Sequence, residues 1–420
     1  MGNAQSPEGA NPRFTSAIRS FSEKELSDLK SLFESLAAQS QSEGHYISIS
    51  VFKAYTGIKG PLADRLYDLV SQNRKDDKLT FQDLIIAKGT YEKGTRDEID
   101  EFLYQLCDVD GDGNLVSRSD LEAVISEILD NVLPVKKSEP SSVSDPKSIS
   151  IFLDASKFTK DNEGSSEKSM SFEDFRNWCR LIPSARKFLV TLLKPTSDTQ
   201  VPHLVYQDDI DSSMLLLKEE YAWHIGGALS HQELDEWKLM YHSAFNGLSF
   251  NTFLGNISNA EGPTVLIIKD KEGYIYGGYA SQPWERHADF YGDMKTFLFQ
   301  LYPTASIYRP TGANNNIQWC AVNFSSDSIP NGIGFGGRTS HFNLFISSNF
   351  DNGHTFTGPT FNNPCLSKNN HIYPEVIECW GVVPKGGQQE KQDGIKGTVL
   401  DRFKEDRNML NLVGLANSSN

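Results

Sequence analysis

Three aspartates at alternate positions, Asp108, Asp110 and Asp112, have the residue type and spacing to bind a metal ion. They fill positions 1, 3 and 5 of a calcium-binding EF-hand loop, in which carboxylate oxygens surround the ion. Gly113 stands at position 6, where the chain must turn sharply, and Asn114 offers its carbonyl at position 7. The first half of this loop therefore predicts calcium binding.

The second half of the loop departs from the pattern. Counting from Asp108, Leu115 is at position 8, where it is expected to pack against a partner loop. Position 12, which normally supplies a bidentate glutamate, is Ser119, and Asp120 follows one residue late. Because the missing ligand supplies two of about seven oxygens, we expect one weakly bound calcium ion. Its candidate ligands are Asp108, Asp110, Asp112, Asn114 and Asp120, and the alternative is a loop without metal, held by its own Asx turns.

A loop of this kind needs a helix before it and companion hands beside it. The preceding residues carry apolar side chains at helical spacing, from Ile99 to Leu106. The ranges 47–52, 79–84 and 170–175 read as the rear halves of three more loops. Their first positions are Ser40, Gln72 and Glu163, and their early residues lack the alternate carboxylates that calcium needs. These three loops are expected to be scaffolding.

The first helix of this half has a clear start. Ser22 and Glu25 form a capping box, and Phe21 with Leu26 occupies the two positions of a hydrophobic staple. We predict an all-helical, EF-hand-like domain over residues 21–195, interrupted by an exposed and mobile insertion rich in proline and serine over residues 134–149.

Composition limits the classes of function. The 420 residues are 38% apolar and 23% charged, as in globular proteins of two or three domains. A formal charge of −15 repels polyanions, so no nucleic-acid partner is expected. No apolar run approaches about 18 residues, and the first residues lack a secretory signal, so we expect a cytoplasmic protein. Five widely spaced cysteines without a C-x-x-C pair indicate reduced core thiols.

The amino terminus carries a possible lipidation signal. Met1-Gly2-Asn3-Ala4-Gln5-Ser6 fits the pattern that exposes Gly2 for N-myristoylation, within a tail expected to be flexible over residues 1–20. The alternative is an unmodified flexible tail. One myristoyl chain binds membranes only marginally, and no polybasic patch is nearby, so attachment to the membrane should be reversible or assisted by a partner.

The second half of the chain reads as sheet. A tight turn at 270–273 joins the apolar runs 265–268 and 274–279 into a hairpin. Further strands are expected at 297–301, 305–309, 317–323, 342–347 and 376–382, and helices at 234–241 and 249–257. The fold class is therefore α+β, with an antiparallel β-sandwich and flanking helices.

Motifs in this half resemble those of TLDc domains, in the same order, over residues 205–383. They are Tyr241-His242-Ser243-Ala244-Phe245-Asn246-Gly247-Leu248-Ser249-Phe250, Gly277-Gly278-Tyr279-Ala280-Ser281 with Trp284, Phe290-Tyr291-Gly292-Asp293, Phe297-Leu298-Phe299, Ile329-Pro330-Asn331-Gly332-Ile333-Gly334-Phe335-Gly336-Gly337 and Glu378-Cys379-Trp380-Gly381.

The resemblance implies a non-enzymatic adaptor. TLDc proteins are linked to oxidation resistance, and several bind the vacuolar proton-pumping ATPase. Together with Gly2 and the helical first half, the whole chain resembles the myristoylated TLDc proteins that are associated with mTOR signalling and the lysosome, or a relative of them. The implied location is the cytosolic face of lysosomal or vacuolar membranes. The alternatives are a myristoylated calcium sensor and an enzyme of unknown chemistry.

Several residues invite a catalytic interpretation that their context does not favour. The glycine run 332–337 lacks the strand–helix setting and spacing of a nucleotide-binding loop, so a crowded turn is expected. His242 and Cys379 are expected to shape the core or surface. Cys320 and Cys379 lie in apolar strands, where burial raises the pKa of a thiol and disfavours peroxide chemistry. No arrangement of nucleophile, base and orienting group is recognisable.

The carboxyl end has its own pattern. Residues 384–397 read as a glycine-rich linker, and residues 398–414 as an amphipathic helix with Leu400, Phe403 and Leu410 on one face. A helix this short needs to bury that face, either on its own protein or in the groove of a partner.

Overall fold

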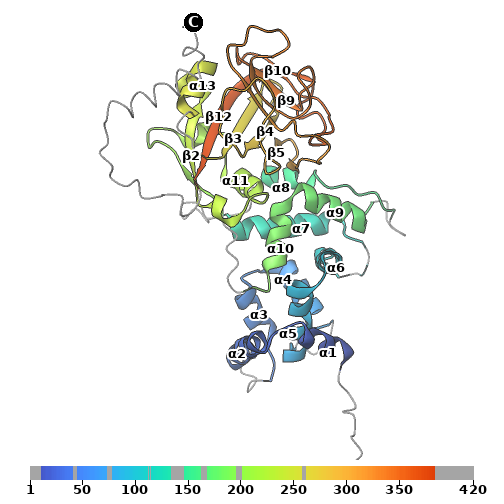
Figure 1. Cartoon of the computed structure of the whole chain (residues 1–420). Helices are drawn as coiled ribbons and strands as arrows, with labels where there is room; N and C mark the ends of the chain where they lie inside the picture. The colour runs from blue at the N-terminus through green and yellow to red at the C-terminus, as the bar shows by residue number, and fades with distance from the viewer. Residues whose placement is uncertain are drawn as a thin grey trace, which may run out of the picture. The chain divides into compact units, whose positions relative to one another are not determined.

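The computed structural model describes residues 11–40, 45–72, 78–111, 113, 115–133, 146–161, 168–194, 201–257 and 262–383. The chain divides into two units, each with its own core (Figure 1). The helical unit comprises Met1–Arg180 and Ala185–Thr199, and the sheet unit comprises Leu181–Ser184 and Gln200–Asn420. Among the described helices, none combines the length and the apolar character needed to cross a bilayer.

The described elements of the helical unit are all helical. They are α1 (Pro12–Arg19), α2 (Glu23–Gln39), α3 (Ile49–Thr56), α4 (Gly60–Val70), α5 (Phe81–Lys88), the π-helical turn η1 (Gly89–Lys93), α6 (Arg96–Cys107), α7 (Arg118–Val132), α8 (Pro146–Leu153), α9 (Phe172–Leu181) and α10 (Pro183–Thr191), whose first two residues belong to the sheet unit.

The predicted start of α2 is confirmed. The Ser22 backbone N–H donates to Glu25 Oε2 at 2.7 Å, and the Glu25 N–H donates to Ser22 Oγ at 3.3 Å. Phe21 and Leu26 belong to the same apolar cluster, as a hydrophobic staple requires. A capping side chain of this kind contributes about 1 kcal/mol by satisfying otherwise orphaned backbone donors.

The expectation of a flexible tail over residues 1–20 is wrong for residues 12–19, which form α1. The Asn11 side chain caps this helix by accepting from the Arg13 N–H at 3.0 Å. Pro12 stands at the first helical position, where its missing N–H costs nothing. The apolar side chains of α1 pack on a small cluster that they help to bury, formed by Phe21, Leu29 and Ile85.

The insertion also ends earlier than expected. We predicted a mobile segment over residues 134–149, but α8 begins at Pro146 and buries Ile149. Residues 134–145 lie outside the described residues. The end of this proline- and serine-rich segment forms a helix because proline is tolerated at the first helical position and the apolar side chains that follow are buried.

Two sheets form the sheet unit. The seven-stranded sheet has the order β1-β2-β12-β3-β4-β5-β6, and the five-stranded sheet has the order β11-β10-β9-β8-β7. In Figure 1, β12 lies between β2 and β3. The strands are β1 (His203–Val205), β2 (Glu236–His242), β3 (Thr264–Asp270), β4 (Ile275–Ala280), β5 (Phe297–Tyr302), β6 (Ser306–Tyr308), β7 (Gln318–Ala321), β8 (Gly332–Phe335), β9 (Leu344–Ser347), β10 (Gly353–His354), β11 (His371–Ile372) and β12 (Pro374–Val383).

The predicted sandwich and hairpin are confirmed. One buried core joins side chains of both sheets, among them Leu266 and Leu298 from the first and Ile333 and Ile346 from the second. β3 and β4 pair as an antiparallel hairpin, and β1 with β2 is the parallel pair. The helical elements of this unit are η2 (Ser212–Met214), α11 (Glu219–Gly226), η3 (His231–Leu234), α12 (Ser243–Asn246) and α13 (Phe250–Ile257).

Residues 234–241 do not form the predicted helix. From Glu236 onward they are β2, which pairs with β12 on one side and β1 on the other. Trp237 and Tyr241, four residues apart, are fully buried. This spacing fits a helical period and a strand period equally, and pairing with two neighbouring strands decided between them.

Candidate functional site

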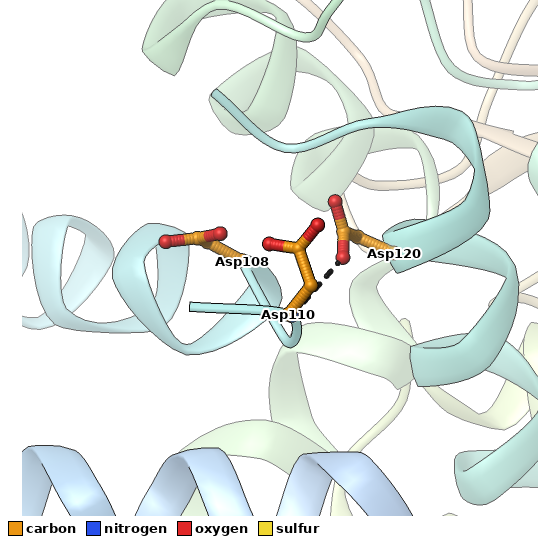
Figure 2. Close-up of side chains that lie close together, drawn as sticks. All are labelled: Asp108, Asp110 and Asp120. Atoms are coloured by element: carbon orange, nitrogen blue, oxygen red, sulfur yellow. Dashed lines mark hydrogen bonds between the residues drawn. The ribbon is translucent and has the colours of Figure 1, made fainter. Parts of the chain in front are cut away.

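The third EF-hand-like loop gathers three carboxylates. α6 ends immediately before Asp108, and α7 begins shortly before Asp120. One carboxylate oxygen from each of Asp108, Asp110 and Asp120 lies within 4.8 Å of the others (Figure 2). Asp108 and Asp120 are buried, whereas Asp110 is exposed. Asp112 and Asn114, the other predicted ligands, lie outside the described residues.

The pairing of this loop differs from the sequence prediction by one residue. The Met170 N–H donates to the Val116 carbonyl at 2.8 Å, so Val116 occupies position 8 in place of Leu115. The first pair of loops is joined at the corresponding positions by two such bonds, between Ile47 and Leu79. Val116 is fully buried, while Leu115 is partly exposed. The prediction for Leu115 is therefore wrong. This loop has one residue more than the standard loop, so the next apolar residue, Val116, makes the contact with the partner loop.

This shift brings Asp120 to the place of the twelfth residue. Asp120 is the third residue of α7, and Ser117 before it is the N-cap. The same box of hydroxyl and aspartate, three residues apart, begins α5 at Thr80–Asp83 and α9 at Ser171–Asp174. The third loop is thus one residue longer than the loop from Gln72 to Asp83. Aligning the loops by their capping boxes, rather than counting from Asp108, would have found this in the sequence.

Both oxygens of Asp120 are oriented by hydrogen bonds. Oδ2 accepts from the Ser117 N–H at 2.9 Å and from its hydroxyl. Oδ1 accepts from the Asp110 N–H at 3.4 Å, as the dashed line in Figure 2 shows. The Oδ1 oxygen therefore points into the loop, where a cation would lie between it and the other two carboxylates.

Arg65 brings a positive charge to this site, and sequence analysis missed it. Its Nη2 lies 3.0 Å from Asp108 Oδ2, and its Nε donates to the Gln105 carbonyl at 3.0 Å. The two charged side chains are only 12% and 7% exposed, so solvent screens the pair weakly. Arg65 lies on α4, far from the loop in the chain, and no local pattern connects the two.

Hydrogen bonds between protein groups hold the other three loops. Ser40 Oγ accepts from the Ser48 N–H at 2.9 Å in the first loop. Asp83 accepts a long bond from the Gln72 amide in the second, and Asp174 accepts from the Thr159 hydroxyl in the fourth. Among the described residues, the cluster at Asp108 is the one group of three acidic, histidine or cysteine side chains close enough to share a metal ion.

None of the five cysteines, all within the described residues, has the environment of a reactive thiolate. Burial raises the pKa of Cys320 and of Cys379 to about 12, as the sequence predicted in direction. Burial also raises the pKa of Cys107, Cys179 and the half-buried Cys365. Because the thiolate is the nucleophile, these thiols are poorly suited to scavenging peroxide.

His242 belongs to a buried network in the sheet unit. Its Nδ1 accepts from the Ala244 N–H at 3.1 Å, and its Nε2 lies 3.3 Å from Glu378 Oε1. Glu378 is completely buried and also accepts from the backbone N–H groups of Leu216 and Leu217. The network ties the chain before α11 to the end of β2 and to the middle of β12, in line with the core or surface-shaping role expected for His242.

The glycine run 332–337 is crowded by backbone, as predicted, although its first half is strand β8 rather than turn. A Cβ at Gly332 would lie 2.2 Å from the Ile346 carbonyl oxygen, and one at Gly337 would lie 2.1 Å from the His341 carbonyl oxygen. Gly336 and Gly337 also have positive φ angles of 64° and 81°, which favour glycine. Packing between strands accounts for these glycines.

The remaining predicted sites are outside the described residues. Gly2 lies in residues 1–10, and Leu400, Phe403 and Leu410 lie in residues 384–420, together with the predicted linker and helix. Lipidation and partner binding at these residues stay predictions.

Comparison with known proteins places the sheet unit. The family model of the TLDc domain matches residues 187–383, beginning earlier than the residue 205 at which we expected the domain to start. The MTOR-associated protein MEAK7 of mouse is 32% identical over 200 residues, which are 47% of this chain and 43% of the mouse protein. The protein of that name from Xenopus laevis is 30% identical over 260 residues, covering 58% of this chain and 55% of its own length. Oxidation resistance protein 1 of Xenopus tropicalis is 31% identical over 144 residues, 34% of this chain and 16% of that protein. The matches thus span about half or less of each relative.

Proposed function

We propose, from the premise that residues 187–383 form a TLDc domain, that this chain is a non-enzymatic regulator that acts as an adaptor at endolysosomal or vacuolar membranes. The observation that carries the proposal is the similarity of this domain to proteins named for association with MTOR and for oxidation resistance. The partner we propose is the vacuolar proton-pumping ATPase, to which the TLDc resemblance pointed. A contribution to oxidative-stress resistance would then be indirect.

The chemistry of the described residues supports a role without catalysis. The raised pKa values of the cysteines disfavour direct peroxide reduction. The buried acid–histidine pair, Glu378 and His242, is engaged by backbone groups and orders a surface instead of facing a substrate. A regulator that binds through surfaces needs such ordered loops and no reactive group.

Membrane attachment in this proposal uses Gly2. A single myristoyl chain gives an association constant of only about 10⁴ M⁻¹, so a protein partner at the membrane would supply the second contact. Reversible attachment suits a regulator that joins and leaves a membrane complex.

Affinity purification from solubilised endolysosomal membranes, with quantitative mass spectrometry, tests the partner. We expect subunits of the vacuolar ATPase with the wild type and at least fivefold less of them with Phe403→Asp/Leu410→Asp, at a nearly unchanged thermal midpoint. Asn408→Asp/Asn411→Asp adds the same charge to the same segment and is the matched control, expected to keep the partner. Absence of ATPase subunits from the wild-type sample would refute the proposed partner.

A calcium sensor is the second candidate function, favoured by the cluster of Asp108, Asp110 and Asp120. Calorimetric titration should give a single weak calcium site in the wild type and none in Asp110→Ala. Asp110 is the exposed member of the cluster, so its replacement is expected to leave the fold intact. If the wild type releases no heat at millimolar calcium, the loop is structural and this candidate is rejected.

A further inference from the structure

An exposed apolar patch lies at the end of β2 in the sheet unit. We define it by Met214, Phe245 and Leu248, which are 50%, 43% and 43% exposed. They are three of the six large apolar side chains that are this exposed among the described residues. Grouped exposed side chains of this kind mark binding surfaces more often than single ones do.

Contacts around one histidine bring the patch together. The Met214 carbonyl lies 3.3 Å from His242 Nε2, and the Phe245 ring centroid lies 4.5 Å from that of His242. Leu248 follows Gly247, whose carbonyl accepts from the Tyr241 hydroxyl at 2.7 Å. The patch therefore combines η2 with the chain that runs from β2 through α12.

A buried charge orders the patch from beneath. Glu378 is completely buried on β12, and its carboxylate accepts from the Leu216 and Leu217 N–H groups and from Trp380 Nε1. Burying a carboxylate is costly unless hydrogen bonds satisfy it, and here they fix the backbone just beyond Met214. An apolar surface held this firmly loses little conformational entropy when something binds to it.

The chain itself supplies an apolar segment within reach. β12 carries Glu378 and ends at Val383, about 17 Å further along the strand. A flexible chain of the length of residues 384–397 has a root-mean-square span of about 20 Å. A segment joined to β12 by such a chain would be present at the patch at an effective concentration of order millimolar.

Residues 398–414 contain Leu400, Phe403 and Leu410, which the sequence pattern predicts on one face of a helix. A segment of this length is marginal as a free helix in water, so burial of this face is what would order it. We propose that residues 398–414 dock on the patch of Met214, Phe245 and Leu248 in the same molecule. In this arrangement the segment stays bound to the patch until a partner competes for the segment. The proposal holds whatever the identity of that partner.

Photo-crosslinking in the full-length protein tests the dock. Replacing Phe403 with p-benzoylphenylalanine places a probe that reacts readily with methionine, and peptide mapping should find the crosslink at Met214 or within residues 244–248. The crosslinked species should be a monomer, in a yield that does not change on tenfold dilution. A crosslinked dimer would assign the segment to a second copy, and crosslinks to other surfaces, or none, would also overturn the proposal.

Surface variants give the second readout. Phe245→Ser/Leu248→Ser should lower the crosslink yield at least fivefold and speed amide hydrogen exchange in residues 398–414 by a similar factor. Met294→Ser replaces another side chain of equal exposure, 48%, and is expected to change neither quantity. If the double variant unfolds, Leu248→Ser alone replaces it in both measurements. Unchanged amide hydrogen exchange of residues 398–414 in a folded variant would contradict the proposed docking. Neither measurement involves binding to the vacuolar ATPase. A negative result would therefore reject the docking and leave the proposed function untouched.

Discussion

The Val116 carbonyl accepts a hydrogen bond from the Met170 N–H at 2.8 Å, and this contact sets the register of the third loop. It joins two loops at the positions that correspond to Ile47 and Leu79 in the first two loops, which exchange two such bonds. With Val116 in the pair, the loop gains one residue, and Asp120 comes to the place of the twelfth residue. The carboxylates of the loop are thereby closer to the EF-hand pattern than counting along the chain indicated.

Replacing either of two neighbouring residues by glutamate tests this register. Asp120→Glu should tighten calcium binding about tenfold, because the longer side chain can reach the ion with both oxygens. Ser119→Glu, which would restore the standard pattern by sequence count, should change the affinity less than twofold. Calorimetry measures both, and tightening by Ser119→Glu alone would show that the loop binds calcium in the register of the sequence count.

Arg65→Gln should raise calcium affinity about tenfold. The guanidinium lies 3.0 Å from Asp108 Oδ2 and opposes a second positive charge at the same carboxylate. Arg180→Gln is the control, because Arg180 pairs with Glu173 in an exposed position on α9. Weaker calcium binding in Arg65→Gln would mean instead that Arg65 acts mainly by orienting Asp108.

Gly2→Ala should abolish myristoylation and release the protein from membranes. The expected mass of the wild type from eukaryotic cells includes one myristoyl group, because Gly2 to Ser6 fit the acceptor pattern. Intact-mass spectrometry and membrane fractionation measure the two effects. An unacylated wild-type mass would contradict the prediction, and an acylated protein that stays soluble would show that the lipid alone is insufficient.

His224 should make the sheet unit less stable as pH falls. Burial lowers its pKa to about 3, whereas an unfolded histidine titrates near 6.5. Between these values only the unfolded state takes up the proton, so stability is full above about pH 6.5 and declines as pH falls toward 3. From pH 7 to pH 5 the contribution of this residue declines by about 2 kcal/mol.

His224→Gln isolates that contribution. The variant is expected to be less stable than the wild type at pH 7, since it replaces a completely buried ring, but to lose about 2 kcal/mol less on going to pH 5. Urea unfolding followed by tryptophan fluorescence gives both values. Equal losses in the two proteins would show that His224 already binds its proton in the folded state.

Local signals in the sequence predicted those elements whose causes are local. The capping box at Ser22 and Glu25 begins α2 because its donors and acceptors lie within one turn. The hairpin of β3 and β4 follows from two apolar runs and a tight turn. In contrast, β2 was predicted as helix because Trp237 and Tyr241 fit both periods, and only pairing with β12 excludes the helix.

The sequence by itself determined the spacing of the carboxylates at Asp108 and Asp110, the start of α2 and the α+β class, since each depends on residues near one another in the chain. Tertiary structure alone decided that Arg65 reaches Asp108 and that Glu378 orders the surface at Met214. These contacts join residues far apart in the chain. Their partners are chosen by packing and by the need to satisfy buried polar groups, which no local spacing records.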